Sequence, residues 1–124
     1  MNPKLWKRLE READEEVAAV LRRLPAAVHE SVREIPIVFE AYPSDDMVED
    51  GVEPDLLGLF VGDAYAEDGQ HPALRQIYLF LLNIWDDAAE DPAEYRTQVR
   101  QTLLHEIGHY LGLEEEDLEE RGLE

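Results

Sequence analysis

Apolar residues recur every three or four positions through the first 24 residues of the chain, with Arg, Glu and Lys between them. This spacing predicts an amphipathic helix of about five turns, ended by Pro25. The next segment, 26–32, predicts one or two further helical turns. The apolar positions of the long helix are Leu5, Leu9, Ala13, Val17, Val20, Leu21 and Leu24.

Three segments rich in branched and aromatic residues predict strands at 35–42, 56–65 and 76–85. The third is apolar on both faces for most of its length, which is typical of a buried strand, although its length also permits a helix. Polar loops at 43–55 and 63–75 separate the segments. The pattern therefore predicts a small sheet that follows the first helix.

A second long helix has a clear start signal. Asp91 can cap the helix, Pro92 occupies its first position, and Glu94 follows three residues after the cap, as in a capping box. Gly112 is free to adopt the left-handed conformation that ends a helix. These signals predict a helix over 92–111.

The end of this helix carries the motif His-Glu-x-x-His, with His105 and His109 four residues apart and Glu106 directly after the first. Side chains at this spacing project from one helix face, so the two imidazoles can chelate one ion. Zinc accepts neutral imidazole readily, and a catalytic site leaves one position to water. Glu106 is placed to take a proton from that water and to pass it to a leaving amine.

The other face of the same helix is apolar, so the helix is expected to bury that face and turn the two histidines toward a cleft. The alternative is a pair of histidines on a solvated helix face that binds no metal. The apolar positions are Val99, Leu103, Ile107, Tyr110 and Leu111.

Composition narrows the classes of protein. The chain has 124 residues with no repeat, which predicts one domain over 1–124, and it has no cysteine, which excludes disulfides and thiolate metal sites. A net charge of −19 argues against nucleic acid or an anionic membrane as a partner. This charge favours solubility, or docking on a basic partner. No signal peptide or membrane span is evident, so we expect a cytoplasmic protein.

The stretch HEIGHYLGLEE resembles the zincin signature His-Glu-x-x-His-x-x-Gly-x-x-(His/Asp). The order of long helix, LRRLP, strand, LLGLF, apolar strand and motif helix resembles the small bacterial zincin-like metallopeptidases. This resemblance implies an α+β fold, a minimal zincin fold in which a mixed sheet of three or four strands packs against the long first helix and the motif helix. It also implies zinc as cofactor and peptide or protein substrates.

Carried over position by position, the resemblance makes His105 and His109 metal ligands and Glu106 the general base. The third ligand then falls on Glu115, where the small bacterial family usually has Asp and metzincins have His. Glutamate also binds zinc through oxygen, but its extra methylene moves the carboxylate farther from the backbone. The neighbouring acids that could replace it are Glu114, Glu116, Asp117 and Glu119.

The sequence lacks the methionine turn of metzincins, and it does not identify the substrate-binding strand or the oxyanion-stabilising residue. The only methionines are Met1 and Met47, so no methionine turn follows the motif, and a full metzincin is not expected. The cleft should be shallow, with an extended peptide paired to an edge strand, either LLGLFV (56–61) or QIYLFL (76–81). Candidates by residue type for stabilising the oxyanion are Tyr65, His71 and Tyr78, while His71 and His29 are more typical of surface histidines.

Two kinds of function fit these residues. The first is a zinc metallopeptidase that uses Glu106, with a zinc amidase acting on a small substrate as its nearest variant. The second is a non-catalytic acidic interaction module in which a metal only holds the C-terminal segment. Catalysis requires the Glu106 carboxylate and metal binding does not, so this residue separates the two hypotheses. The oligomeric state stays open.

Overall fold

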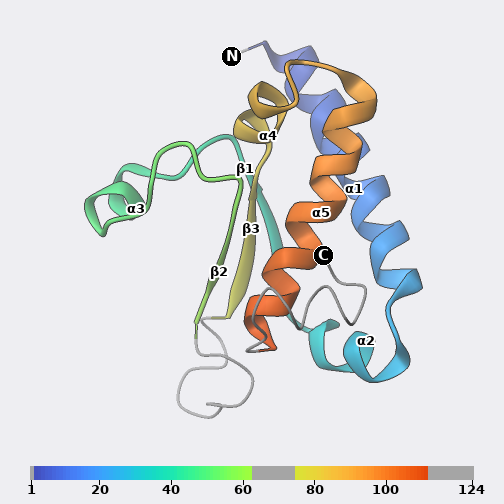
Figure 1. Cartoon of the computed structure of the whole chain (residues 1–124). Coiled ribbons are helices and arrows are strands. Elements are labelled where there is room, and N and C mark those ends of the chain that lie inside the picture. Colours follow the sequence, from blue (N-terminus) through green and yellow to red (C-terminus); the bar gives the residue numbers. More distant parts are fainter. Residues whose placement is uncertain (1, 63–74, 112–124) are drawn as a thin grey trace.

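The computed structural model describes residues 2–62 and 75–111. Within them the chain forms five helices and a three-stranded sheet, which is the α+β zincin-like fold expected from the sequence (Figure 1). No described helix is long and apolar enough to cross a membrane. The elements are α1 Pro3–Arg23, α2 Ala26–Val32, β1 Ile37–Glu40, α3 Asp45–Glu49, β2 Gly58–Val61, β3 Gln76–Phe80, α4 Leu81–Asp87 and α5 Pro92–Tyr110.

Helix α1 follows the predicted pattern. The Asn2 side chain accepts hydrogen bonds from the backbone N–H groups of Lys4 and Leu5, which satisfies donors at the helix start. The helix ends at Leu24, which is extended because it precedes Pro25. The predicted stripe is buried at Leu9, Ala13, Val17 and Val20. The short helix α2 then forms the predicted extra turns.

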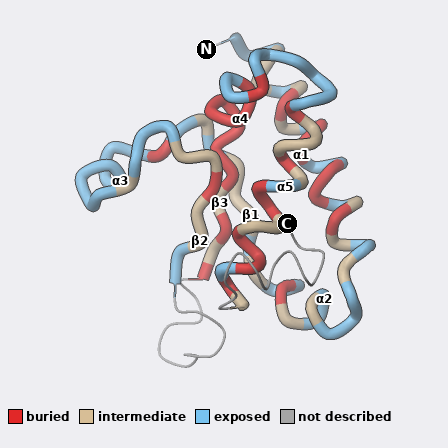
Figure 2. The backbone as a smooth tube through the Cα atoms, in the orientation of Figure 1, coloured by how far each residue is buried: buried red, intermediate tan, exposed pale blue. Residues whose placement is uncertain are grey.

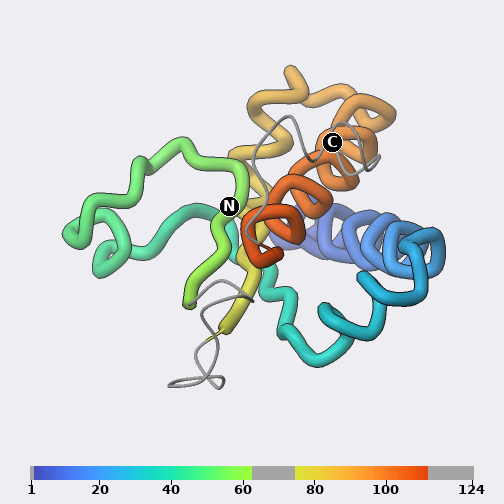
Figure 3. The backbone as a smooth tube through the Cα atoms, turned by 60° about the horizontal axis from the view of Figure 1, so that its bottom comes forward, coloured from blue at the N-terminus to red at the C-terminus, as the bar shows by residue number. Residues whose placement is uncertain are grey.

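The three strands form a mixed sheet in the order β1-β3-β2, with β1 parallel and β2 antiparallel to β3. Helix α5 packs on one face of this sheet, and α1 lies beside α5 on the side away from β2 (Figures 1 and 3). The segment around α3 projects away from this body (Figure 3). Buried stretches of β3 and α4 lie beside buried stretches of α5 and α1, which are both on the same side of them (Figure 2).

The predicted strand over 76–85 is wrong in its second half, because β3 ends at Phe80 and α4 takes up residues 81–87. All residues from 81 to 85 are buried, and periodicity cannot distinguish a helix from a strand when every position is buried. The Asn83 side chain donates to the carbonyls of Pro54 and Leu56, which ties α4 to the segment before β2.

The other elements differ from the predictions mainly at their ends. The strands β1 and β2 are shorter than the predicted 35–42 and 56–65, and residues 63–65 lie outside the described part of the chain. The predicted loop 43–55 contains the short helix α3, which Ser44 caps by accepting from the Met47 N–H.

Helix α5 starts as predicted, with the Asp91 side chain accepting from the backbone N–H of Glu94 at 2.8 Å. The capping box is only half formed. The Asp91 N–H donates to the carbonyl of Ala88, and the Glu94 carboxylate accepts from Gln98. One side-chain cap is therefore enough to start the helix here.

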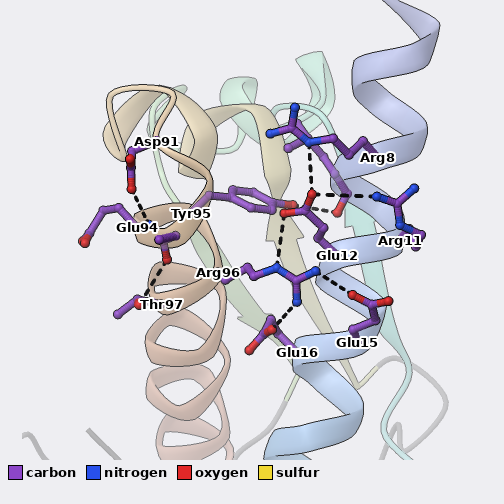
Figure 4. Close-up of polar contacts among 12 residues, drawn as sticks. Arg8, Arg11, Glu12, Glu15, Glu16, Asp91, Glu94, Tyr95, Arg96 and Thr97 are labelled. Carbon is purple, nitrogen blue, oxygen red and sulfur yellow. Dashed lines mark hydrogen bonds and ion pairs between the residues drawn. The ribbon is translucent and has the colours of Figure 1, made fainter.

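Arginines of α5 join it to glutamates of α1 through an ionic network (Figure 4). Arg96 contacts Glu12 at 3.4 Å and both Glu15 and Glu16 at 2.6 Å, while Arg100 contacts Glu16 at 2.5 Å. Burial alone would raise the pKa of Glu16, but the hydrogen bonds and positive charges of the two arginines outweigh it, so this pKa lies below its usual value. Ionised Glu16 therefore strengthens the network that joins the motif helix to α1.

Stability should fall in acid because of Glu16. A carboxyl whose folded pKa is lowered adds stability above its unfolded pKa of about 4.3, and that stability is lost as the pH falls through the folded value. We expect Glu16→Gln to lower the free energy of unfolding by about 1 to 2 kcal/mol at neutral pH, since both arginines are partly exposed. Urea unfolding should show this gap closing below about pH 4. Glu15→Gln, at a half-exposed position, is the control and should have a smaller effect. A stability difference between wild type and Glu16→Gln that stays constant with pH would show that ionised Glu16 is not the cause.

Candidate metal centre

The motif residues gather at one point on the sheet side of α5. The ring centroids of His105 and His109 are 4.4 Å apart, and one donor atom from each of these residues and from Glu106 lies within 4.8 Å of the others. Two imidazoles and a carboxylate are donor types that zinc accepts. The arrangement of these residues therefore fits a metal ion.

Glu106 is buried, with only 6% of its surface exposed, and its Oε1 lies 3.3 Å from Nδ1 of His109. A hydrogen bond to one ring nitrogen fixes an imidazole and leaves the other nitrogen for a metal. His109 is half exposed while the glutamate beneath it is not. The carboxylate is therefore held in place next to the group that would bind the ion.

The two histidines line a cavity of about 700 Å³ between α5 and β2. Its walls are residues 56–60 on one side and Gln98, Gln101 and Thr102 of α5 on the other, with Asp87 of α4 as a further lining residue. The opposite face of the helix is buried at Val99, Leu103, Ile107 and Tyr110, as predicted. The expected cleft is therefore present, and the histidines do not lie on a simple solvated face.

Gly58 brings β2 unusually close to the motif helix. A Cβ atom at this position would lie 2.5 Å from Cγ2 of Thr102 and 3.3 Å from Cγ of Glu106. Real Cβ atoms are almost never as close to a neighbour as the first of these distances. The absence of a side chain at Gly58 therefore sets how near the strand edge lies to the candidate base.

Gly58→Ala should destabilise the protein by about 1 to 3 kcal/mol, because the new methyl group overlaps the Thr102 methyl group. Serine lacks that methyl group, so Thr102→Ser in the Gly58→Ala background should recover part of the loss. A double-mutant cycle measured by urea unfolding tests this coupling. Strictly additive effects of the two substitutions would show that the close approach is not what Gly58 provides.

Among the described strands, β2 lies at an edge of the sheet, whereas β3 is central and paired on both sides. QIYLFL (76–81) is thus wrong as the candidate edge strand, and LLGLFV (56–61) borders the cavity with its residues 56–60. The Phe80 N–H donates to the Leu57 carbonyl, so Leu57 directs its backbone groups toward β3. In an antiparallel pair, every second residue of a strand is hydrogen-bonded to its neighbour and the residues between point away. The backbone groups of Gly58 and Phe60 therefore point to the free edge of the strand.

The remaining predicted residues are not part of this site as described. Phe60 points toward α5, where it contacts Tyr110, and Tyr78 lies on the opposite face of the sheet. The Tyr78 hydroxyl donates to the Gln76 side chain at 2.7 Å. Tyr78 therefore does not reach this cavity as an oxyanion donor. His29 is exposed on α2, as expected for a surface histidine.

Glu115 lies outside the described residues, and so do the acids that could replace it and two of the oxyanion candidates. These are Glu114, Glu116, Asp117, Glu119, Tyr65 and His71, and Gly112 lies there too. The cavity also holds residues that the sequence reasoning did not single out. Gln98, Gln101 and Thr102 precede His105 at helical spacing on one face, a signal that could have found them, whereas Gly58 and Asp87 come from other elements.

A small mixed sheet backed by two helices, one with His-Glu-x-x-His facing a cavity at the sheet edge, defines the zincin class of fold. The family model described as zincin-like metallopeptidase matches residues 32–123, and the chain belongs to this family. None of the curated protein sequences matches the chain. Membership of this family implies a metal, typically zinc, and a hydrolase.

Proposed function

We propose that this protein is a zinc-dependent metallopeptidase that hydrolyses peptide bonds. The observation that supports this most strongly is the convergence of His105, Glu106 and His109 on a cavity bordered by a free strand edge. His105 and His109 would hold the zinc ion, with Glu115 as the third ligand. Zinc bound there would act as a Lewis acid toward the scissile carbonyl and lower the pKa of water.

Glu106 is the general base of the proposed reaction. Its carboxylate takes a proton from the attacking water and then delivers that proton to the nitrogen of the leaving amine. Its burial and the contact with His109 hold the carboxylate in one place, so little reorganisation is needed during the reaction. The same glutamate thus serves both proton transfers.

The strand edge supplies the means of holding a peptide. The N–H and C=O groups of Gly58 and Phe60 have no backbone partner within the described residues and can pair with an extended substrate, a contact that requires no particular side chain. Gly58 also lies close to Glu106, since a Cβ atom at Gly58 would be 3.3 Å from Cγ of Glu106. A peptide bond on this edge would therefore lie beside the base.

The test is the zinc content of the purified full-length chain, measured by mass spectrometry without chelators or an affinity tag. We expect one zinc per chain in the wild type, a large loss in Glu115→Ala, and wild-type content in Glu120→Ala, a matched acid of the same stretch. Cleavage of a peptide mixture should stop on chelation and return with zinc. A wild type that binds no zinc when the metal is supplied would contradict the proposal.

A further inference from the structure

The cavity extends beyond the residues that the proposed reaction uses. Gln98 lies seven residues before His105 on α5, a rise of about 10 Å along the helix. Asp87 is the last residue of α4 and lies four residues before Asp91, the cap of α5, so it lines the cavity from the side where α5 begins. The cavity therefore has a second end, about three residues of an extended peptide away from the histidines.

Two hydrogen-bond acceptors line this second end. The side-chain oxygen of Gln98 is buried and has no hydrogen-bond donor within the described part of the chain, while the amide nitrogen donates to Glu94. The Asp87 carboxylate is exposed, and the described residues offer it no hydrogen bond or ion pair. An unmet acceptor and an exposed carboxylate that line the same cavity favour a ligand that carries N–H donors and positive charge.

The wall between the two ends is apolar. Leu56 and Leu57 precede β2, and the Asn83 side chain holds the Leu56 carbonyl to α4, so these leucines lie toward Asp87. Phe60 lies toward the histidine end, where it contacts Tyr110. A bound peptide would thus meet apolar side chains before it reaches the acceptors.

We propose that the cavity selects peptides with an apolar residue next to the scissile bond and a lysine or arginine about three positions away, whose cationic group binds Asp87 and the Gln98 oxygen. This inference rests on the proposed peptidase function for the position of the scissile bond. The net charge of −19 attracts a cationic peptide wherever its positive charge lies. Binding to Asp87 and to the Gln98 oxygen, in contrast, requires the positive charge at one position along the peptide.

The probe is a set of end-blocked fluorescent alanine peptides with two central leucines, in which one lysine or one glutamine occupies each other position in turn. Binding is measured by fluorescence anisotropy on the zinc-loaded Glu106→Gln protein, so that no peptide is cleaved. We expect the lysine peptide to bind about two- to five-fold more tightly than its glutamine partner, only where lysine lies about three positions from the leucines.

Asp87→Asn should remove this preference, and Asp86→Asn should keep it, because Asp86 is also exposed but does not line the cavity. Gln98→Met is a second variant that should weaken the preference without changing net charge. Equal preferences in the Asp86 and Asp87 variants, or lysine favoured equally at all positions, would overturn the inference and leave only general attraction by charge.

The same peptides separate this inference from the proposed function. If the wild type cleaves none of them while Asp87 still sets a position-dependent preference, the peptidase proposal fails and the binding site stands. If the wild type cleaves peptides and the preference is absent or independent of Asp87, the selectivity proposal fails alone.

Discussion

Glu106→Gln should abolish peptide-bond hydrolysis while the zinc content stays at the wild-type level. The amide has the shape of the carboxylate but cannot accept the proton from the attacking water, and loss of general base catalysis typically lowers the rate by about 100- to 10,000-fold. Glu106 is buried beside His109 and against Gly58, so the replacement also preserves the packing of the site. The measurement is turnover of a cleaved peptide together with zinc per chain.

Glu94→Gln is the matched control for this substitution, because it changes the same residue type on an exposed turn of the same helix. It should leave both turnover and zinc content unchanged. Wild-type turnover by the Glu106 variant would exclude the residue as general base. Zinc binding without turnover by the wild-type protein would favour the non-catalytic interaction module.

The long helices α1 and α5 could be predicted because local signals agree with the tertiary structure. Asp91 and Pro92 start α5 in the sequence and in the structure, and the apolar stripes of α1 and α5 are the faces that are buried. The segment 81–85 lacks such a signal, because it is buried on all sides. The helix begins where β3 ends, and Asn83 within it bonds the carbonyls of Pro54 and Leu56. These partners lie far from Asn83 in the sequence, so no local pattern reveals the contact.

Some residues of the candidate site could likewise be predicted from the sequence, and others could not. His105, Glu106 and His109 share one helix, so their spacing alone predicts that they meet. Gly58 and Asp87 join the site only because β2 and α4 pack beside α5, and no local pattern encodes that packing. The assignment of Glu115 rests on family resemblance in a stretch where almost every residue is acidic, so composition gives it no support.

His105→Ala and His109→Ala should each lose most of the bound zinc, and His109→Ala should also lose stability in the absence of metal. Loss of a residue that only hydrogen-bonds a metal ligand typically lowers metal affinity by about 10- to 100-fold. Loss of the ligand itself should lower the zinc affinity further. His109→Ala also removes the contact that orients Glu106, whereas His105→Ala leaves it in place. Competition with a zinc-binding dye measures the first effect.

Thermal unfolding of the metal-free variants measures the second effect. A buried carboxylate that loses its partner costs about 1 kcal/mol or more, so metal-free His109→Ala should be less stable than the metal-free wild type. His29→Ala, at an exposed position on α2, is the control and should retain both zinc affinity and stability. Unchanged zinc affinity in either motif variant would exclude that histidine as a ligand. Equal stability of metal-free His109→Ala and the metal-free wild type would mean that His109 acts on the metal alone and that packing beside Gly58 is what positions Glu106.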